Sequence, residues 1–234
     1  MQKLKLVFLC VSSALFLAAS SSFAEDPVEP PFQKDIDAFE KDRVENEIPE
    51  GAVLCVGSSS MRMWGDRIER DLAPLTVIPR GFGGSKFSDV LYHFDKLVTA
   101  YKPRAILIYE GDNDLGSGMT PKEVLGDFMA FRKRVEELDP DIRIYVIGVK
   151  PSISRWHLKK RIAKTNRLIE AACEKDEKLT FIDVAEFLLN DEGEPREQIF
   201  LEDNLHLNTV GYHLWAAAIG LEIVPAERKY EEVD

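Results

Sequence analysis

The sequence is poor in the residues that build metal and nucleotide sites. It has three cysteines and four histidines among 234 residues, and no Cys/His spacing in it resembles a zinc site. It has neither the Gly-Lys-Ser/Thr of a P-loop nor a Gly-x-Gly-x-x-Gly fingerprint. Glycine-rich loops can still bind phosphate groups, but these absences disfavour a flavodoxin-like nucleotide binder.

Basic residues are also scarce relative to acidic ones. There are 30 Lys and Arg against 41 Asp and Glu, which gives a formal net charge of −11. An acidic surface repels phosphate backbones and anionic lipid headgroups, so we expect neither nucleic acid nor an anionic membrane as a partner. A neutral small-molecule or carbohydrate substrate is compatible with this charge.

Only one long apolar run is present, and it lies at the N-terminus. Basic Lys3 and Lys5 precede an apolar stretch over 6–19, and Ser22-Phe23-Ala24 fits a small-x-small cleavage site. The apolar stretch is too short and too rich in serine for a good membrane span. We therefore expect residues 1–24 to be a signal peptide cleaved after Ala24, and the protein to be secreted or periplasmic without stable membrane insertion.

Two cysteines remain after the predicted cleavage. Cys55 lies within a predicted buried strand, where a small apolar side chain is the usual role, and Cys173 lies on a predicted helix. We expect no disulfide between them, although an exported chain can form one.

The rest of the chain divides into three segments. Residues 25–50 are acidic, and Phe32, Ile36, Phe39 and Val44 recur at helical spacing, which predicts a short amphipathic helix and a linker. Residues 51–224 carry the main domain. Residues 225–234 are acidic and are expected to form a frayed tail.

Strand and helix patterns alternate five times in the main domain. Apolar runs predict strands over 52–56, 75–78, 105–109, 142–147 and 179–183. Helical patterns follow them over 60–72, 90–101, 120–138, around 162–172 and over 209–223. This alternation predicts an α/β fold, a three-layer α/β/α sandwich with a five-stranded parallel, flavodoxin-like sheet.

Polar loops follow several of the predicted strands. Because parallel strands end at one edge of their sheet, we expect Ser59, Gly84, Asn113 and His206 to converge there. Taken alone, the Gly-Ser-Ser-Ser stretch at 57–60 also fits a polar turn with a helix cap.

Four short blocks resemble the SGNH (GDSL-type) hydrolases, over about residues 52–218. They are Gly57-Ser58-Ser59, Gly81-Phe82-Gly83-Gly84, Gly111-Asp112-Asn113-Asp114 and Asp203-Asn204-Leu205-His206. The first block has Ser58 where the family has aspartate, which leaves open the contacts that this aspartate usually makes. The resemblance implies an ester hydrolase with neither a metal nor an organic cofactor.

Each block contributes a residue type that serine hydrolysis needs. Ser59 is the expected nucleophile, His206 the base, and Asp203 the carboxylate that orients the imidazole from one helical turn or a tight loop. The expected oxyanion donors are the backbone N–H groups of Ser59 and Gly84 and the side-chain amide of Asn113.

Five further residues are candidates for substrate binding. Arg62 and Trp64 either line the cleft or pack beneath it, and Arg80 either reaches substrate or pairs with an acid. Trp156 and His157 are candidates for the rim, since they lie on a loop after the fourth predicted strand.

The resulting hypothesis is an exported serine esterase that removes short acyl groups, such as acetyl, from a carbohydrate or small molecule. One alternative is a lysophospholipase or thioesterase of the same family. The other is a non-catalytic binding module on the same fold.

Overall fold

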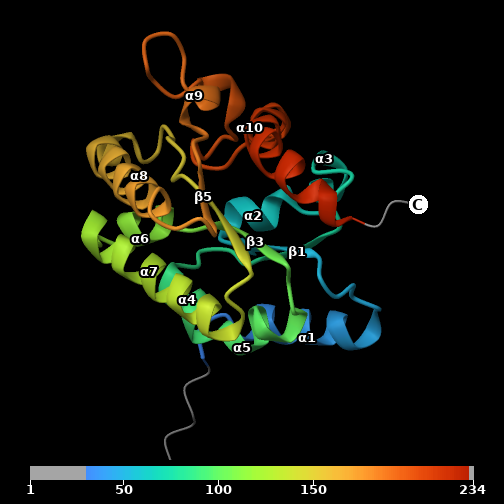
Figure 1. Ribbon diagram of the computed structural model, residues 1–234. Helices are drawn as coiled ribbons and strands as arrows, with labels where there is room; N and C mark the ends of the chain where they lie inside the picture. Colours follow the sequence, from blue (N-terminus) through green and yellow to red (C-terminus); the bar gives the residue numbers. More distant parts are fainter. Residues whose placement is uncertain (1–29, 232–234) are drawn as a thin grey trace, which may run out of the picture. The chain divides into compact units, whose positions relative to one another are not determined.

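A single parallel sheet organises the protein, shown as a computed structural model in Figure 1. The structure describes residues 30–231, so the predicted signal peptide lies outside them. The strands are arranged in the order β2-β1-β3-β4-β5, which is the flavodoxin-like order. Their bounds are β1 Val53–Gly57, β2 Val77–Gly81, β3 Ala105–Tyr109, β4 Arg143–Ile147 and β5 Leu179–Ile182.

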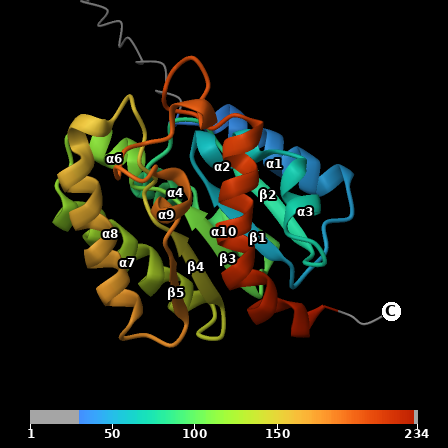
Figure 2. The same ribbon diagram turned by 90° about the horizontal axis from the view of Figure 1, so that it is seen from above.

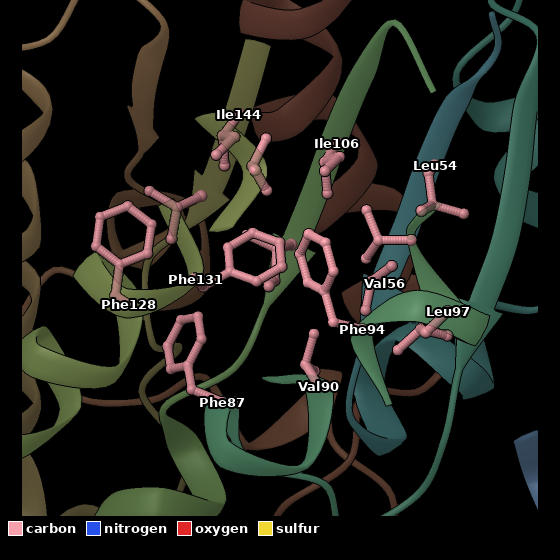
Figure 3. Close-up of a cluster of buried hydrophobic side chains, with 14 of the residues drawn as sticks. Leu54, Val56, Phe87, Val90, Phe94, Leu97, Ile106, Phe128, Phe131 and Ile144 are labelled. Atoms are coloured by element: carbon pink, nitrogen blue, oxygen red, sulfur yellow. The ribbon is translucent and has the colours of Figure 1, made fainter. Parts of the chain in front are cut away.

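One face of the sheet is covered by five helices, seen in Figures 1 and 2. They are α1 Gln33–Glu45, α4 Phe87–Tyr92, α5 Phe94–Leu97, α7 Pro121–Leu138 and α8 Lys159–Cys173. Figure 3 shows the phenylalanines of α4, α5 and α7 against the aliphatic side chains of β1, β3 and β4. The ring centroids of Phe87 and Phe128, and those of Phe94 and Phe131, are 5.9 Å apart.

The opposite face is covered by α2 Ser59–Trp64, α3 Arg67–Asp71, α9 Ala185–Leu188 and α10 Thr209–Glu227. Aromatic rings dominate this second core: Trp215 packs against Trp64, Tyr109 and Tyr212. Short 3-10 helices complete the elements: η1 Thr99–Tyr101, η2 Trp156–Leu158, η3 Glu197–Ile199 and η4 Arg228–Tyr230. The predicted three-layer architecture is therefore confirmed.

Capping groups and backbone angles explain which predicted helices form as expected and which are divided into shorter helices. Helix α7 begins as expected, because the Thr120 hydroxyl accepts from the Glu123 N–H and Pro121 occupies the first turn. The helix predicted over 60–72 is instead split into α2 and α3 at Gly65, whose φ of 53° is outside the helical region. The pattern over 90–101 likewise forms three short pieces, α4, α5 and η1.

The two flanking segments depart from expectation in part. Helix α1 forms and buries Ile36, but Val44 is 77% exposed rather than on the buried face. The expected frayed tail is wrong as far as residue 231, because α10 runs to Glu227 and η4 follows it. The Glu227 carboxylate is fully buried among Arg104, Arg143 and Tyr145, which anchors this end of the chain.

Both cysteines are buried free thiols, and burial raises the pKa of each, that of Cys173 to about 12. Within residues 30–231, no helix combines the length and apolarity needed to cross a bilayer.

Candidate active site

The turn after β1 presents Ser59 as the first residue of α2. Gly57 closes β1, and a Cβ there would lie 2.4 Å from the Tyr109 carbonyl oxygen, so only glycine fits against β3. The Ser58 N–H donates to the same carbonyl at 3.1 Å. Strand β3 therefore fixes the turn that holds Ser59.

A continuous hydrogen-bonded chain links Ser59, His206 and Asp203. His206 Nε2 lies 2.8 Å from Ser59 Oγ, and Nδ1 lies 2.5 Å from Asp203 Oδ2. A carboxylate only accepts hydrogen bonds, so Nδ1 carries the proton and Nε2 is free to accept from the serine hydroxyl. This is the tautomer that a general base for Ser59 requires.

A tight loop, rather than a helical turn, brings Asp203 beneath the imidazole. Its Oδ1 accepts from the N–H groups of Leu205 and His206, both at 2.9 Å, while Asn204 takes a left-handed φ of 57°. Partial burial works to raise the pKa of Asp203, but the hydrogen bonds from the His206 ring and the two backbone N–H groups outweigh it and lower that pKa to about 2. Asp203 is therefore ionised throughout the neutral range.

The three expected oxyanion donors follow three neighbouring strands. Ser59 follows β1, Gly84 follows β2 and Asn113 follows β3 on α6 Asp112–Gly116, a short helix that the sequence did not predict. Gly84 has a φ of 91°, which favours glycine. Among residues 30–231, the N–H groups of Ser59 and Gly84 have no acceptor, so both are available for substrate.

The Asn113 amide is held at both ends. Its Nδ2 donates to the Ser85 carbonyl at 3.0 Å, and its Oδ1 accepts from Arg155 Nη2 at 2.9 Å. An amide nitrogen carries two hydrogens, so one remains for a developing oxyanion.

Buried carboxyl groups support the donors from behind. Glu110 Oε1 lies 2.6 Å from Ser85 Oγ, which also lies 3.0 Å from the Phe82 carbonyl. The Ser85 hydroxyl has one proton for these two oxygens, and a protonated Glu110 satisfies both contacts. Burial raises the pKa of Glu110 well above its usual value, which favours this protonated form.

Asp114 stabilises the same region through the backbone. Its carboxylate accepts from the N–H groups of Phe87 at 3.2 Å and Gly111 at 3.0 Å. Burial raises its pKa to about 6, partly offset by these hydrogen bonds. Asp114 thus holds the start of α4 against the loop that begins α6.

Two substrate-binding candidates are structural. Trp64 is fully buried in the second core, where its indole N–H donates to Asp71 at 3.0 Å, so it packs beneath the site and does not line it. Arg80 is buried and pairs with Asp42 at 2.6 Å while donating to the Tyr101 hydroxyl. Pairing, rather than substrate contact, is the role of Arg80.

The other three candidates are accessible. Arg62 is exposed one helical turn after Ser59, and its guanidinium lies over Gly83, where a Cβ would be 2.7 Å from Cζ. Trp156 is half-buried and His157 exposed on η2, with Lys159 Nζ 4.7 Å from the Trp156 ring centroid. Their contact with substrate stays a prediction.

Sequence reasoning missed Ser85, Glu110 and Arg155. The first two directly adjoin Gly84 and Gly111 of the family blocks, and that adjacency was the available signal. Arg155 lies 42 positions from Asn113, and nothing in its own neighbourhood marks it.

Comparison with known proteins identifies the family. Residues 48–214 match the GDSL-like Lipase/Acylhydrolase family. Platelet-activating factor acetylhydrolase IB subunit alpha1 of Bos taurus is 26% identical over 167 residues, covering 70% of this chain and 71% of its own.

Two solved structures share the fold. A GDSL-like lipase from Bacteroides thetaiotaomicron has a TM-score of 0.69 at 18% identity, covering 82% of this chain and 98% of its own. A Clostridium thermocellum family 3 carbohydrate esterase has a TM-score of 0.64 at 16% identity, covering 78% and 100%. Given the family match over most of the sequence, this chain belongs to the GDSL-like lipase/acylhydrolase family of ester-hydrolysing enzymes.

Proposed function

We propose that this protein is an exported serine esterase in which Ser59 is the nucleophile. The observation that carries the proposal is the chain Asp203–His206–Ser59, with its 2.5 and 2.8 Å contacts and the single tautomer that they require. Export rests on the signal-peptide pattern of residues 1–24, and predicts that the exported protein begins at Glu25.

The reaction follows from this geometry. Ser59 Oγ attacks the ester carbonyl carbon while His206 Nε2 takes the hydroxyl proton, and Asp203 stabilises the resulting imidazolium. The carbonyl oxygen becomes an oxyanion that accepts from Ser59 N–H, Gly84 N–H and Asn113 Nδ2. Each such donor typically lowers the barrier by about 3–4 kcal/mol.

Collapse of the tetrahedral intermediate completes the first half. The bond to the alcohol oxygen breaks, His206 gives its proton to that oxygen, and an acyl group remains on Ser59. Water then enters, His206 takes a proton from it, and the hydroxide attacks the acyl carbon. The carboxylic acid leaves, and the proton returns from His206 to Ser59 Oγ.

We favour a short acyl group as the substrate. Between residues 51 and 224 the sequence contains no long apolar insertion of the kind that would form a lid over a lipid chain. The names of the relatives, an acetylhydrolase and a carbohydrate esterase, support acetyl esters of a carbohydrate or small molecule as substrates.

The first test is fluorophosphonate labelling of the purified protein, read by intact mass and peptide mapping. We expect one adduct, on Ser59, that disappears in Ser59→Ala. Ser60→Ala is the matched control, since Ser60 is the next residue of the same helix and is buried, and it should label normally. A folded wild-type protein that takes no adduct would favour the non-catalytic binding module.

A panel of acetyl to long-chain esters then separates the enzymatic alternatives. Activity that falls with chain length supports the acetylesterase, and activity that rises with chain length supports the lysophospholipase or thioesterase. The mass of the exported wild-type protein reports cleavage after Ala24 in the same measurement.

A further inference from the structure

We propose that Arg155 is a positioning residue that keeps the Asn113 amide in the orientation required by the oxyanion. The inference rests on the proposed function, since it assigns a task to Arg155 within the same reaction. Arg155 lies between β4 and η2, on a segment that the family blocks do not include.

The side-chain amide of Asn113 can occupy its site in two orientations that have nearly the same shape but different hydrogen-bonding groups. A half-turn about its last side-chain bond would exchange the NH2 group for the carbonyl oxygen. The oxygen would then repel the developing negative charge that the NH2 group stabilises. A site that depends on this amide therefore needs a partner that accepts only one of the two orientations.

Arg155 is such a partner because a guanidinium only donates. Its Nη2 donates to Asn113 Oδ1 at 2.9 Å, so a turned amide would place an NH2 group against it. On the other side, Nδ2 donates to the Ser85 carbonyl at 3.0 Å, which only accepts. The two contacts together select the productive orientation.

The guanidinium is itself tightly placed. Its Nη1 donates to the backbone carbonyl of Asp112 and lies 2.7 Å from the Asp112 carboxylate. That carboxylate is also 3.4 Å from Lys150, whose side chain is fully buried. A planar fork that bonds two neighbouring residues at once is a geometry that lysine does not reproduce.

Gly116 makes room for this arrangement. A Cβ at Gly116 would lie 2.9 Å from Arg155 Cζ, closer than side-chain atoms normally approach. Gly116 is the last residue of α6, and it has no positive φ that would by itself require glycine. Gly116→Ala therefore displaces the guanidinium without altering Arg155.

Orientation, rather than charge, is the main contribution of Arg155. The charge of the guanidinium is paired with the adjacent Asp112 carboxylate, whereas the hydrogen bond to Asn113 Oδ1 acts on the orientation of the amide. A misdirected catalytic group commonly costs about 100-fold in rate, so we expect Arg155→Ala to lower kcat on p-nitrophenyl acetate by about 10- to 100-fold. KM should change by less than about 3-fold, because the ground-state ester gains little from the donors.

A double-mutant cycle tests the route through Asn113. Asn113→Ala should cost about 100- to 1,000-fold in kcat. If Arg155 acts only through this amide, Arg155→Ala made in the Asn113→Ala background should cause no further loss. A general structural role would instead lower the activity of the double variant by an additional factor.

Arg161→Ala is the matched control. Arg161 also ties the segment after α6, donating to the carbonyls of Gly118 and Met119, but it does not contact Asn113. It should retain kcat within about 2-fold. Arg155→Lys and Gly116→Ala, which keep the charge or the arginine, should show smaller losses of the same kind and secure the test if Arg155→Ala fails to fold.

The outcomes separate the two proposals. Fluorophosphonate labelling of wild-type Ser59 reports the proposed function independently of Arg155. With labelling intact, full activity of Arg155→Ala or additive losses in the cycle would overturn the positioning role. Absence of labelling in the wild type would overturn the serine mechanism itself and the role of Arg155 with it.

Discussion

The two ends of the sheet each contain a buried glutamate, and the pKa values of the two are shifted in opposite directions. Glu227 lies where β3 and β4 begin, beside Arg104 and Arg143. Glu110 lies where β3 ends, behind the oxyanion donors. Both side chains are at most 1% exposed, so any difference between them comes from their partners and not from burial.

Glu227 is surrounded by donors. Arg143 bonds both of its oxygens, at 2.5 and 2.9 Å, Arg104 donates at 3.1 Å and the Tyr145 hydroxyl at 2.7 Å. Burial alone would raise the pKa of Glu227, but these hydrogen bonds and charges outweigh it and lower the pKa below the usual value. Glu227 is therefore ionised in the folded protein.

Glu110 has one serine hydroxyl at its first oxygen, and its second oxygen has no partner within residues 30–231. Nearby Asp112 and Asp114 add negative charge, and burial together with this charge raises its pKa well above the usual value. The amino end of the sheet thus uses an ionised carboxylate as an anchor, and the carboxyl end holds a carboxyl group whose raised pKa favours the neutral form.

Three substitutions test the contrast between Glu227 and Glu110, and Glu227→Gln should have the largest effect on stability. It removes the carboxylate that pairs with the partly buried Arg104 and Arg143, of which Arg104 still pairs with Glu231. Breaking a fully buried pair typically costs about 3–5 kcal/mol, so we expect a loss of about 3 kcal/mol here. Urea unfolding at pH 7 measures the loss, and Glu222→Gln on the exposed side of the same helix should stay within about 0.5 kcal/mol of wild type. A loss below about 1 kcal/mol for Glu227→Gln would contradict the anchoring role.

Tyr145→Phe should have an intermediate effect. It removes one of the three donor residues of Glu227 and leaves both arginines, and a hydrogen bond to a charged group contributes about 1.5–3 kcal/mol. The same urea series measures it, with Tyr230→Phe as the control, because Tyr230 is 46% exposed. Equal stabilities of the two variants would mean that the arginines alone hold Glu227.

Glu110→Gln should have the smallest effect at acid pH and should change the pH dependence. The glutamine side chain can hydrogen-bond Ser85 in place of the carboxylic acid, so stability below about pH 4.5, where the folded and the unfolded carboxyl are both protonated, should be within about 1 kcal/mol of wild type. Because its pKa is higher in the folded than in the unfolded protein, Glu110 favours folding at low pH, and this contribution is lost as pH rises above about 4.5.

The comparison of pH profiles is the measurement. Between about pH 5 and 8, the stability of wild type should fall relative to that of Glu110→Gln. For Glu227 the sign is opposite, since its lowered pKa adds stability above its unfolded pKa and loses it as pH falls through the folded value. Parallel profiles of wild type and Glu110→Gln would show that Glu110 is ionised.

Patterns that depend on neighbours in sequence were predicted well. Strand β3 matches its predicted bounds, because a continuous apolar run between a proline and a polar loop has few other interpretations. The parallel sheet with helices on both faces follows from the alternation of strands and helices, and the convergence of Ser59 with His206 follows because parallel strands end at one edge.

Features that depend on distant partners were not predictable in this way. Trp64 looked like a cleft residue because it follows Ser59, but its aromatic partners lie on α10, about 150 positions later. The tail beyond residue 224 looked frayed because the arginines that pair with its acidic residues, Arg104 just before β3 and Arg143 at the start of β4, are distant in sequence. The contact of Arg155 with Asn113 likewise could not be predicted, because the two residues are brought together only by the fold.

The arrangement of strands determines which segments near the site can change in length. The three proposed oxyanion donors follow adjacent strands, whose spacing of about 4.8 Å is set by the hydrogen-bond ladder of the sheet. Asp203 and His206 instead follow β5 after the largely irregular segment 183–202. Insertions or deletions in the exposed part of that segment, residues 190–194, leave the spacing of the three strands unchanged. The fold therefore separates a part of fixed dimensions, which carries the proposed oxyanion donors, from a part of adjustable length, which precedes the proposed base.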